Sequence, residues 1–231
     1  MRRTPAIVAL VMTVLIGSTA CSRQLTGTAV LGPDQPQTAI TEDEFGIRAG
    51  REDAPVQLEI YTEPQCSHCA DLQADFGDQL AYYIGIGELA VTYRPMTFLD
   101  KKADGYSAHV ATALFGAGGR GGGPEGGGTT RARAFQRFVE DLWAHQDPGG
   151  KGPSNDEMAE MAKKAGIPDA QVAAVAKGSG NVNTKDMEDT NSEFLSEIDP
   201  LDSGTPTVYD LTRDQKLDVY DNDWLSKVMS S

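Results

Sequence analysis

Cysteine and histidine are both scarce in this chain, which has 231 residues and only three of each. A structural zinc site takes four ligands, usually arranged as C-x-x-C repeats or as paired histidines. The sequence has one C-x-x-C motif, Cys66-Ser67-His68-Cys69, and no H-x-x-x-H spacing. His68 lies between the two cysteines, where it cannot easily join them on one metal ion. We therefore expect neither a metal nor another cofactor.

Positive charge is also scarce. Lysine and arginine together number 20, against 34 aspartates and glutamates, and the formal net charge is −14 at pH 7. Because nucleic acid binding depends on basic surfaces, this composition argues against a nucleic acid partner. It also provides no electrostatic attraction to anionic lipid, so attachment to a membrane would rest on acyl chains and on a protein partner.

The apolar run at the amino terminus is too short to span a bilayer comfortably as a helix. Arg2 and Arg3 precede the uncharged run Pro5–Gly17, and small residues then lead to Cys21. This pattern fits a secretory signal and resembles a bacterial lipoprotein signal, in which the cysteine after the cleavage site is diacylated. We expect a signal peptide over residues 1–20 and a lipid anchor at Cys21, on the extracytoplasmic face of the cell membrane. An ordinary secretory signal with a free Cys21 is the alternative.

The segment after the predicted cleavage site has the composition of a tether. Residues 21–42 are rich in Thr, Gln, Gly and Pro and contain few large apolar residues, so they cannot form a core of their own. The roughly 185 residues that follow are enough for one substantial domain with an inserted subdomain.

The CSHC motif is predicted to lie between a strand and a helix. Apolar residues alternate with polar ones along residues 56–61, as in a strand, and then recur every three or four residues along residues 72–83, as in a helix. Cys66 falls at the first turn of this helix, and Cys69, one turn later, joins its buried side. Unpaired amides and the helix dipole favour an anion at such a position, so Cys66 is predicted to ionise readily.

This arrangement favours a redox role for the two cysteines. With Cys21 acylated, Cys66 and Cys69 would be the only thiols, in a compartment where disulfides persist. A low thiol pKa at Cys66 stabilises the reduced form and makes the disulfide more oxidising. A purely structural disulfide is the alternative, but a bridge that closes so small a loop would constrain the unfolded chain little.

A Thr-Pro pair near the end of the chain makes the C-x-x-C motif a more specific indicator of fold. Gly204-Thr205-Pro206-Thr207 follows a long helical stretch, and it is followed by a predicted hairpin (residues 207–211 and 216–220) and a closing helix (residues 221–229). A strand–CxxC–helix unit with a distant Thr-Pro resembles the DsbA-like class of thioredoxin-fold thiol:disulfide oxidoreductases, here as a lipoprotein of the actinobacterial type. The resemblance implies an α/β thioredoxin fold (residues 43–102 and 199–231) with an inserted α-helical subdomain (residues 103–198).

The resemblance also implies roles for the residues that match the motif. Cys66 would be the nucleophile, Cys69 the resolving thiol and Pro206 a cis-proline, on a Thr205-Pro206 loop that faces the substrate. The two cysteines would form a redox-active disulfide, Cys66–Cys69. His68, and secondarily Ser67, would stabilise the Cys66 thiolate.

The implied activity is oxidation of cysteines in exported, folding proteins. A membrane redox partner would then be needed to regenerate the pair. A reductase or isomerase that uses the same site is one alternative. A non-catalytic lipoprotein adaptor that keeps the fold only to bind partners is another.

Two positions depart from the family pattern. Ser67 stands where the class often has proline, and Ile60 stands where many thioredoxin folds bury a carboxylate, six residues before the first cysteine. Glu59 precedes Ile60 and points to the opposite face by strand alternation. Proton transfer to or from Cys69 would therefore use water or another group.

The long insertion contains three further helical patterns and one false motif. Helices are predicted around residues 135–143, from a capping box at Ser154–Glu157 to a stop at Gly166, and over residues 169–177. Gly116–Gly121 fits the dinucleotide fingerprint G-x-G-x-x-G, but a helical pattern precedes it where the fingerprint needs a strand. We interpret this glycine run as a loop between helices.

Overall fold

The computed structural model describes residues 35–120 and 129–230. The predicted signal peptide, the acylation site Cys21, most of the predicted tether and residues 121–128 of the glycine run lie outside the described residues.

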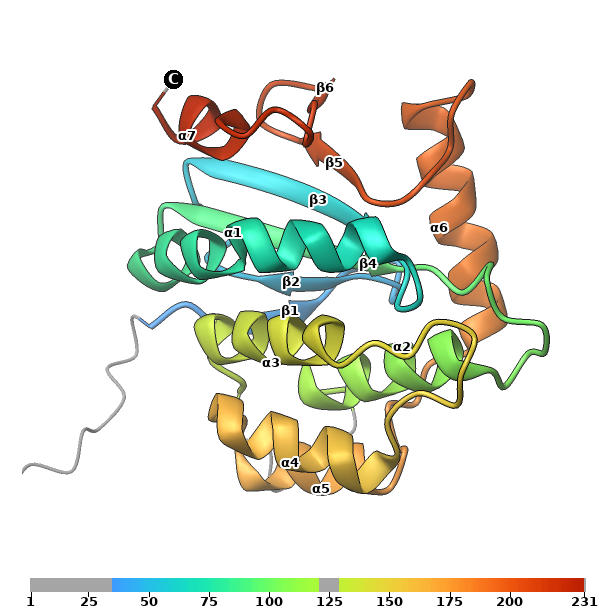
Figure 1. Ribbon diagram of the computed structural model, residues 1–231. Helices are drawn as coiled ribbons and strands as arrows, with labels where there is room; N and C mark the ends of the chain where they lie inside the picture. The colour runs from blue at the N-terminus through green and yellow to red at the C-terminus, as the bar shows by residue number, and fades with distance from the viewer. Residues whose placement is uncertain (1–34, 121–128, 231) are drawn as a thin grey trace, which may run out of the picture. The chain divides into compact units, whose positions relative to one another are not determined.

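A mixed sheet forms the centre of the fold (Figure 1). Its strand order is β1-β2-β4-β3-β5-β6, and only β3 and β4 run parallel to each other. Both are seven-residue strands and almost entirely buried, which explains their high content of apolar residues. The strands are β1 (Thr38–Ile40), β2 (Ile47–Ala49), β3 (Val56–Thr62), β4 (Leu89–Pro95), β5 (Thr207–Asp210) and β6 (Gln215–Lys216).

The described residues also form seven helices. The main core lies where α1 and α3 pack together and against the sheet, and α7 adds Trp224 to it. On the opposite face Tyr61, Met96 and Leu195 form a smaller cluster, to which α6 contributes. The helices are α1 (Ser67–Ile86), α2 (Tyr106–Ala117), α3 (Ala132–Ala144), α4 (Asn155–Ala165), α5 (Asp169–Ala176), α6 (Thr184–Ile198) and α7 (Trp224–Met229).

Most of the predicted elements are present. The strand before the cysteines and the helix after them are β3 and α1, and α2–α6 all lie in the predicted insertion. The capping box is formed in both directions between Ser154 and Glu157, and α4 ends at Gly166 in the left-handed conformation, with φ +90°. A helix, α2, precedes the glycine run, so the dinucleotide fingerprint lacks its strand.

Three predicted boundaries are wrong. Strand β1 lies inside the predicted tether, because residues 38–40 pair with β2. The second hairpin strand was expected over residues 216–220, but β6 ends at Lys216 because the Asp218 carboxylate accepts a hydrogen bond from the Tyr220 N–H at 3.1 Å and turns the chain. The closing helix begins at Trp224 rather than at Asp221, whose carboxylate accepts the Asp223 N–H at 3.1 Å.

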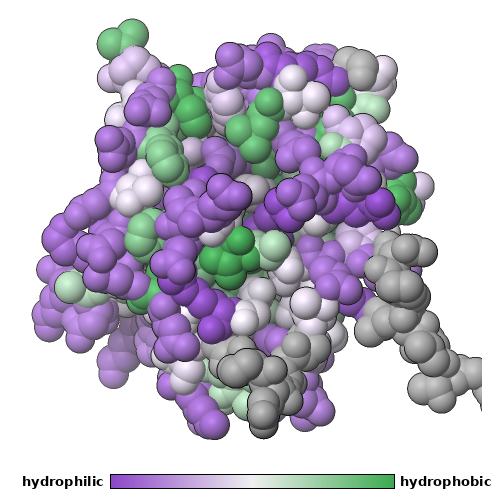
Figure 2. Space-filling model, turned by 180° about the vertical axis from the view of Figure 1, so that it is seen from behind, coloured by the Kyte–Doolittle hydropathy of each residue, from purple (hydrophilic) through white to green (hydrophobic). Residues whose placement is uncertain are grey.

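The visible surface is largely hydrophilic, as the polar composition predicts. Seen from behind, apolar side chains form small separate patches among hydrophilic ones (Figure 2). Within residues 35–120 and 129–230, no helix is both long and apolar enough to cross a membrane.

Candidate active site

Cys66 is the N-cap residue of α1. Its backbone is extended (φ −76°, ψ 117°), and its side chain takes the position in which Ser or Asp normally accepts helix N–H groups. The Cys66 side chain completes no capping hydrogen bond, but the backbone N–H groups of Cys69 and His68, the third and second residues of α1, lower the pKa of its thiol. A thiolate here interacts favourably with the helix dipole.

The two thiols have opposite pKa shifts. The hydrogen bond that the Cys69 thiol donates lowers the pKa of Cys66 to about 5, with further contributions from the Thr205 side chain and from the helix N–H groups. Burial raises the pKa of Cys69, and the neighbouring Cys66 raises it further. Cys69 is fully buried, Cys66 is partly exposed, and both are free thiols in this structure. The pair therefore consists of an accessible nucleophile and a buried partner.

The Thr205–Pro206 loop lies against the first cysteine. The Thr205–Pro206 peptide bond is cis, as the resemblance predicts. The Cys66 thiol donates a hydrogen bond to the Thr205 carbonyl at 3.2 Å, across 139 positions of sequence. The loop leads directly into β5, which pairs with β3, and β3 leads to Cys66. The central sheet thus brings the two distant motifs together.

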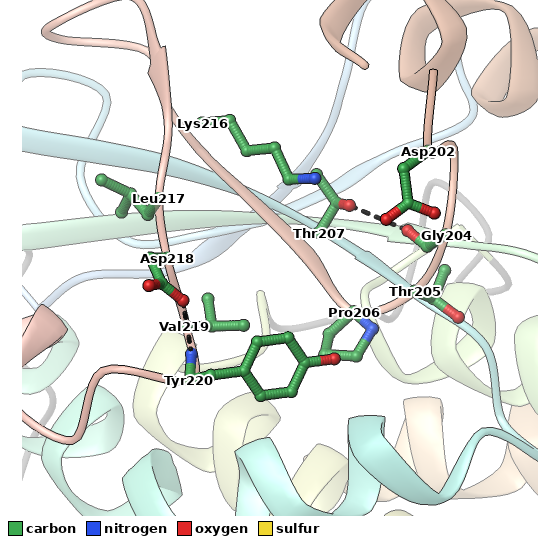
Figure 3. A pocket seen from close by; sticks show the side chains of 10 residues that line it. All are labelled: Asp202, Gly204, Thr205, Pro206, Thr207, Lys216, Leu217, Asp218, Val219 and Tyr220. Carbon is green, nitrogen blue, oxygen red and sulfur yellow. Dashed lines mark hydrogen bonds between the residues drawn. The ribbon is translucent and has the colours of Figure 1, made fainter. Parts of the chain in front are cut away.

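A cavity of about 460 Å³ lies beside this loop (Figure 3). It is lined by the loop and by the chain around β6, and the Tyr220 side chain reaches toward Pro206 at its edge. A second cavity, of about 350 Å³, lies next to it and is lined by His68 and the first turns of α1. Pro206, Val219 and Tyr220 line both cavities, and Tyr220 is 71% exposed. The cis-proline therefore lines two adjoining surface cavities.

Ser67 and His68 are both exposed on the first turn of α1. The His68 ring contacts the Tyr220 ring edge-on, with centroids 6.1 Å apart. The backbone N–H of His68 makes a small contribution to the low pKa of Cys66, after those of Cys69 and Thr205. Thiolate stabilisation by the imidazole, and by the Ser67 side chain, remains a prediction. Within residues 35–120 and 129–230, no three His, Cys, Asp or Glu side chains are grouped to hold a metal ion.

Glu63 is a site residue that the sequence analysis missed. It lies three residues before Cys66 and is fully buried. Its carboxylate accepts hydrogen bonds from the Ser107 hydroxyl and from the Gln65 N–H. Burial nevertheless raises the pKa of Glu63 to about 7, and the nearby charges of Asp100 and Cys66 raise it as well. A buried carboxyl group with a raised pKa thus lies three residues before Cys66, where the sequence analysis had only foreseen water or another group.

Glu59 has a structural role on the other face of the sheet, as strand alternation predicts. Its carboxylate accepts a hydrogen bond from Arg94 Nε at 2.7 Å and one from the Tyr61 hydroxyl at 2.9 Å. Arg94 also pairs with Asp43 at 2.9 Å. These three charges satisfy one another, and Ile60 fills the core on the side of the cysteines.

The helical insertion holds the active-site loop in place. The Gln146 side chain, two residues after α3, donates to the Pro64 carbonyl at 2.9 Å and to the Cys66 carbonyl at 2.8 Å. Gln65 donates from its side chain to Asp100 and to Ser107, both at 3.0 Å. The insertion therefore contacts the loop from two sides.

We expect Gln146→Ala to loosen this loop. Two hydrogen bonds to buried or partly buried carbonyls would be lost, so the free energy of unfolding should fall by about 1–2 kcal/mol. Amide hydrogen exchange at the start of α1 should become faster. His145→Ala is the matched control, because His145 is exposed and its substitution should change stability by less than about 0.5 kcal/mol. Equal effects of the two substitutions would contradict this role for Gln146.

The chain is similar to known thioredoxin-like proteins. A family model described as thioredoxin matches residues 42–117. The solved structure of MdbA, a thiol-disulfide oxidoreductase from Corynebacterium matruchotii, is 21% identical with a TM-score of 0.66, covering 84% of this chain and 91% of that one. DsbA from Chlamydia trachomatis is 18% identical with a TM-score of 0.60, covering 79% of this chain and 89% of that one.

A curated relative is similar over most of this chain but is much longer. The serine/threonine-protein kinase PknE of Mycobacterium tuberculosis is 22% identical over 191 residues. The aligned region is 80% of this chain and only 31% of the kinase.

Together, these findings define the fold. The chain has a thioredoxin fold with the helical insertion of DsbA-like structures, including those from actinobacteria, and the predicted resemblance is confirmed at this level.

Proposed function

We propose that this protein is a thiol–disulfide oxidoreductase that oxidises cysteines of exported proteins through the Cys66–Cys69 pair. The observation that carries the proposal is the Cys66 sulfur at the N-cap of α1, with a pKa lowered to about 5, beside a buried second thiol. At neutral pH the thiolate stabilises the reduced protein, so the disulfide is a good oxidant. The thiol-disulfide oxidoreductase MdbA, which has this fold, supports the assignment.

The reaction proceeds in two exchanges. A substrate thiolate attacks the Cys66 sulfur of the Cys66–Cys69 disulfide, a mixed disulfide forms, and the electron pair of the broken S–S bond goes to the Cys69 sulfur. A second substrate thiolate then attacks the substrate sulfur of the mixed disulfide. The substrate leaves with a disulfide, and Cys66 leaves as a thiolate, which its position at the N-cap stabilises.

The test is oxidation of a reduced dithiol peptide by the oxidised protein, together with a glutathione redox titration of the pair. We expect rapid peptide oxidation and a potential well above the value of thioredoxin, about −270 mV. A potential as low as that of thioredoxin would reverse the direction to reductase. No exchange at all would leave only a binding role.

We also propose where the protein is located and what reoxidises its cysteine pair. We infer an extracytoplasmic protein anchored through acyl chains on Cys21, based on the charged start, the short apolar run and the small residues before this cysteine. A membrane redox partner would accept the electrons of the reduced pair, since each turnover leaves Cys66 and Cys69 as thiols.

Cys21→Ala is expected to release the protein from the membrane. Two acyl chains give stable attachment, whereas an acidic surface does not bind anionic lipid by charge. The measurement is detergent-phase partitioning of the mature chain, together with its sensitivity to an inhibitor of lipoprotein signal peptidase. Unchanged membrane attachment of the Cys21→Ala protein would refute the lipid anchor.

A further inference from the structure

Thr62, the last residue of β3, has a buried hydroxyl group that lacks a hydrogen-bond partner. The residue is 1% exposed, and within the described part of the chain its Oγ1 bonds to no other group. A buried polar group without a partner lowers stability, and most such groups in folded proteins are satisfied. An unused donor next to a reactive site therefore needs an explanation.

Strand alternation places this hydroxyl on the side of the cysteines. Ile60, two residues earlier, packs in the same core as Cys69 under α1. Tyr61 points the other way and packs against Met96 and Leu195. Thr62 therefore faces α1. Its hydroxyl completes no hydrogen bond in this reduced structure, but it lies near enough to the Cys69 sulfur to lower the pKa of that thiol against the larger effect of burial.

Cys69 is the group that most needs a donor during the reaction. When a thiolate attacks Cys66, the Cys66–Cys69 bond breaks and the Cys69 sulfur leaves with the electron pair. This thiolate forms at a fully buried position, where burial opposes the charge. The backbone N–H of Glu63 is one donor directed at it. The rate of exchange increases when the leaving thiolate is stabilised.

We propose that the Thr62 hydroxyl donates a hydrogen bond to the Cys69 sulfur as that sulfur leaves as a thiolate. Thr62 would thus be a catalytic residue of the exchange, an inference that rests on the proposed function. In the reverse step, in which Cys69 attacks the mixed disulfide and the substrate thiolate leaves, the same hydrogen bond stabilises the attacking Cys69 thiolate.

If Thr62 has this role, removing its hydroxyl should change the rates at which the Cys66–Cys69 disulfide opens and closes, but not the equilibrium between the oxidised and the reduced protein. Cys69 is uncharged both in the disulfide and in the resting reduced protein, where its raised pKa keeps it protonated. The hydrogen bond matters only while the sulfur carries charge. Opening and closing of the disulfide should therefore slow by the same factor when the hydroxyl is removed. A merely structural role would instead change the stability of one redox state and shift the equilibrium.

The experiment compares Thr62→Val, which replaces the hydroxyl with a methyl group of similar size, with Thr62→Ser, which keeps the hydroxyl. Excess reduced glutathione opens the oxidised protein, and acid quenching with thiol labelling and mass spectrometry gives the rate. Oxidised glutathione added to the reduced protein gives the closing rate, and a glutathione titration gives the equilibrium constant. Loss of a hydrogen bond to a group that is charged in the transition state slows a reaction by about ten-fold or more.

We expect Thr62→Val to slow opening and closing about ten-fold, with an equilibrium constant within about two-fold of wild type, and Thr62→Ser to restore the rates. Wild-type rates in Thr62→Val would overturn the proposal, as would slow rates in both variants. If the valine variant does not fold, Thr62→Ala is measured in the same way. The opening rate does not require turnover, so this comparison remains decisive even if the wild-type protein fails to oxidise a dithiol peptide, a failure that would refute only the proposed function.

Discussion

Cys66→Ser is expected to abolish thiol–disulfide exchange while leaving the fold intact. Serine is a good N-cap residue, so its hydroxyl should accept helix N–H groups from the N-cap position that Cys66 occupies in the wild-type protein. The nucleophile is lost but the cap is retained. Oxidation of a reduced dithiol peptide should fall to the uncatalysed rate, and the urea unfolding midpoint should stay close to that of the reduced wild-type protein.

Cys66→Ala separates the two roles of the residue. Alanine removes both the nucleophile and the cap, so the activity should again be lost and the free energy of unfolding should fall by about 1 kcal/mol. A serine variant as unstable as the alanine variant would show that Cys66 does not cap α1. Exchange activity that persists in either variant would place the reactive thiol elsewhere.

Cys69→Ser should trap substrates instead of releasing them. The Cys66 thiolate can still attack a disulfide, but the neighbouring Cys69 thiol that would attack the mixed disulfide and release the substrate is gone. Substrates should therefore accumulate on Cys66 and be released by dithiothreitol, as seen on non-reducing gels. A Cys66→Ser/Cys69→Ser double variant is the control and should trap nothing.

The parts of the fold that follow from local pattern could be predicted from the sequence. The alternation before Cys66 and the three-to-four-residue recurrence after Cys69 describe β3 and α1, because each pattern is produced by the element's own geometry. The capping box at Ser154 is equally local. Element ends were less predictable where a side chain competes with the backbone, as Asp218 and Asp221 do.

The site was only partly predictable, because several of its groups acquire their role from distant partners. Glu63 adjoins Cys66 in sequence, but its properties arise from burial and from Ser107, which lies 44 positions away. The position six residues before Cys66, where many thioredoxin folds bury a carboxylate, holds Ile60, and the buried carboxyl lies three residues before Cys66 instead. An acidic residue directly after the strand, three residues before the first cysteine of a C-x-x-C motif, was the available signal.

Glu63→Gln is expected to change both stability and rate, and the dependence of stability on pH distinguishes a buried acid from a surface one. The reference pKa of the carboxyl is 4.5, and burial raises it to about 7 in the folded protein. The folded state therefore binds this proton more tightly than the unfolded state. Wild-type stability is highest below pH about 4.5 on this account, and it decreases as the pH rises through 7, where the buried carboxyl must ionise.

Glutamine has about the same shape and never ionises. The variant should match the wild-type protein near pH 4.5 and be more stable at pH 8, by on the order of 3 kcal/mol, since the pKa rises from 4.5 to about 7 and each pKa unit corresponds to about 1.4 kcal/mol. Urea unfolding of the reduced proteins at both pH values measures the difference. Asp71→Asn is the matched control, because Asp71 is an exposed carboxylate on the first turns of α1 and its removal changes the net charge equally.

The rate should change in the opposite direction to stability. A carboxyl group with a pKa near 7 can accept and return a proton at the pH of the reaction, and a neutral amide cannot. We expect Glu63→Gln to slow peptide oxidation at pH 7 by about 10²-fold, the lower end of the usual range for general acid–base catalysis, and to flatten the rate profile between pH 6 and 8. A variant that is more stable at pH 8 but keeps the wild-type rate would show that Glu63 takes no part in proton transfer and only lowers stability through its buried charge. A variant that loses stability equally at both pH values would show that the hydrogen bonds to Ser107 and Gln65 outweigh the charge.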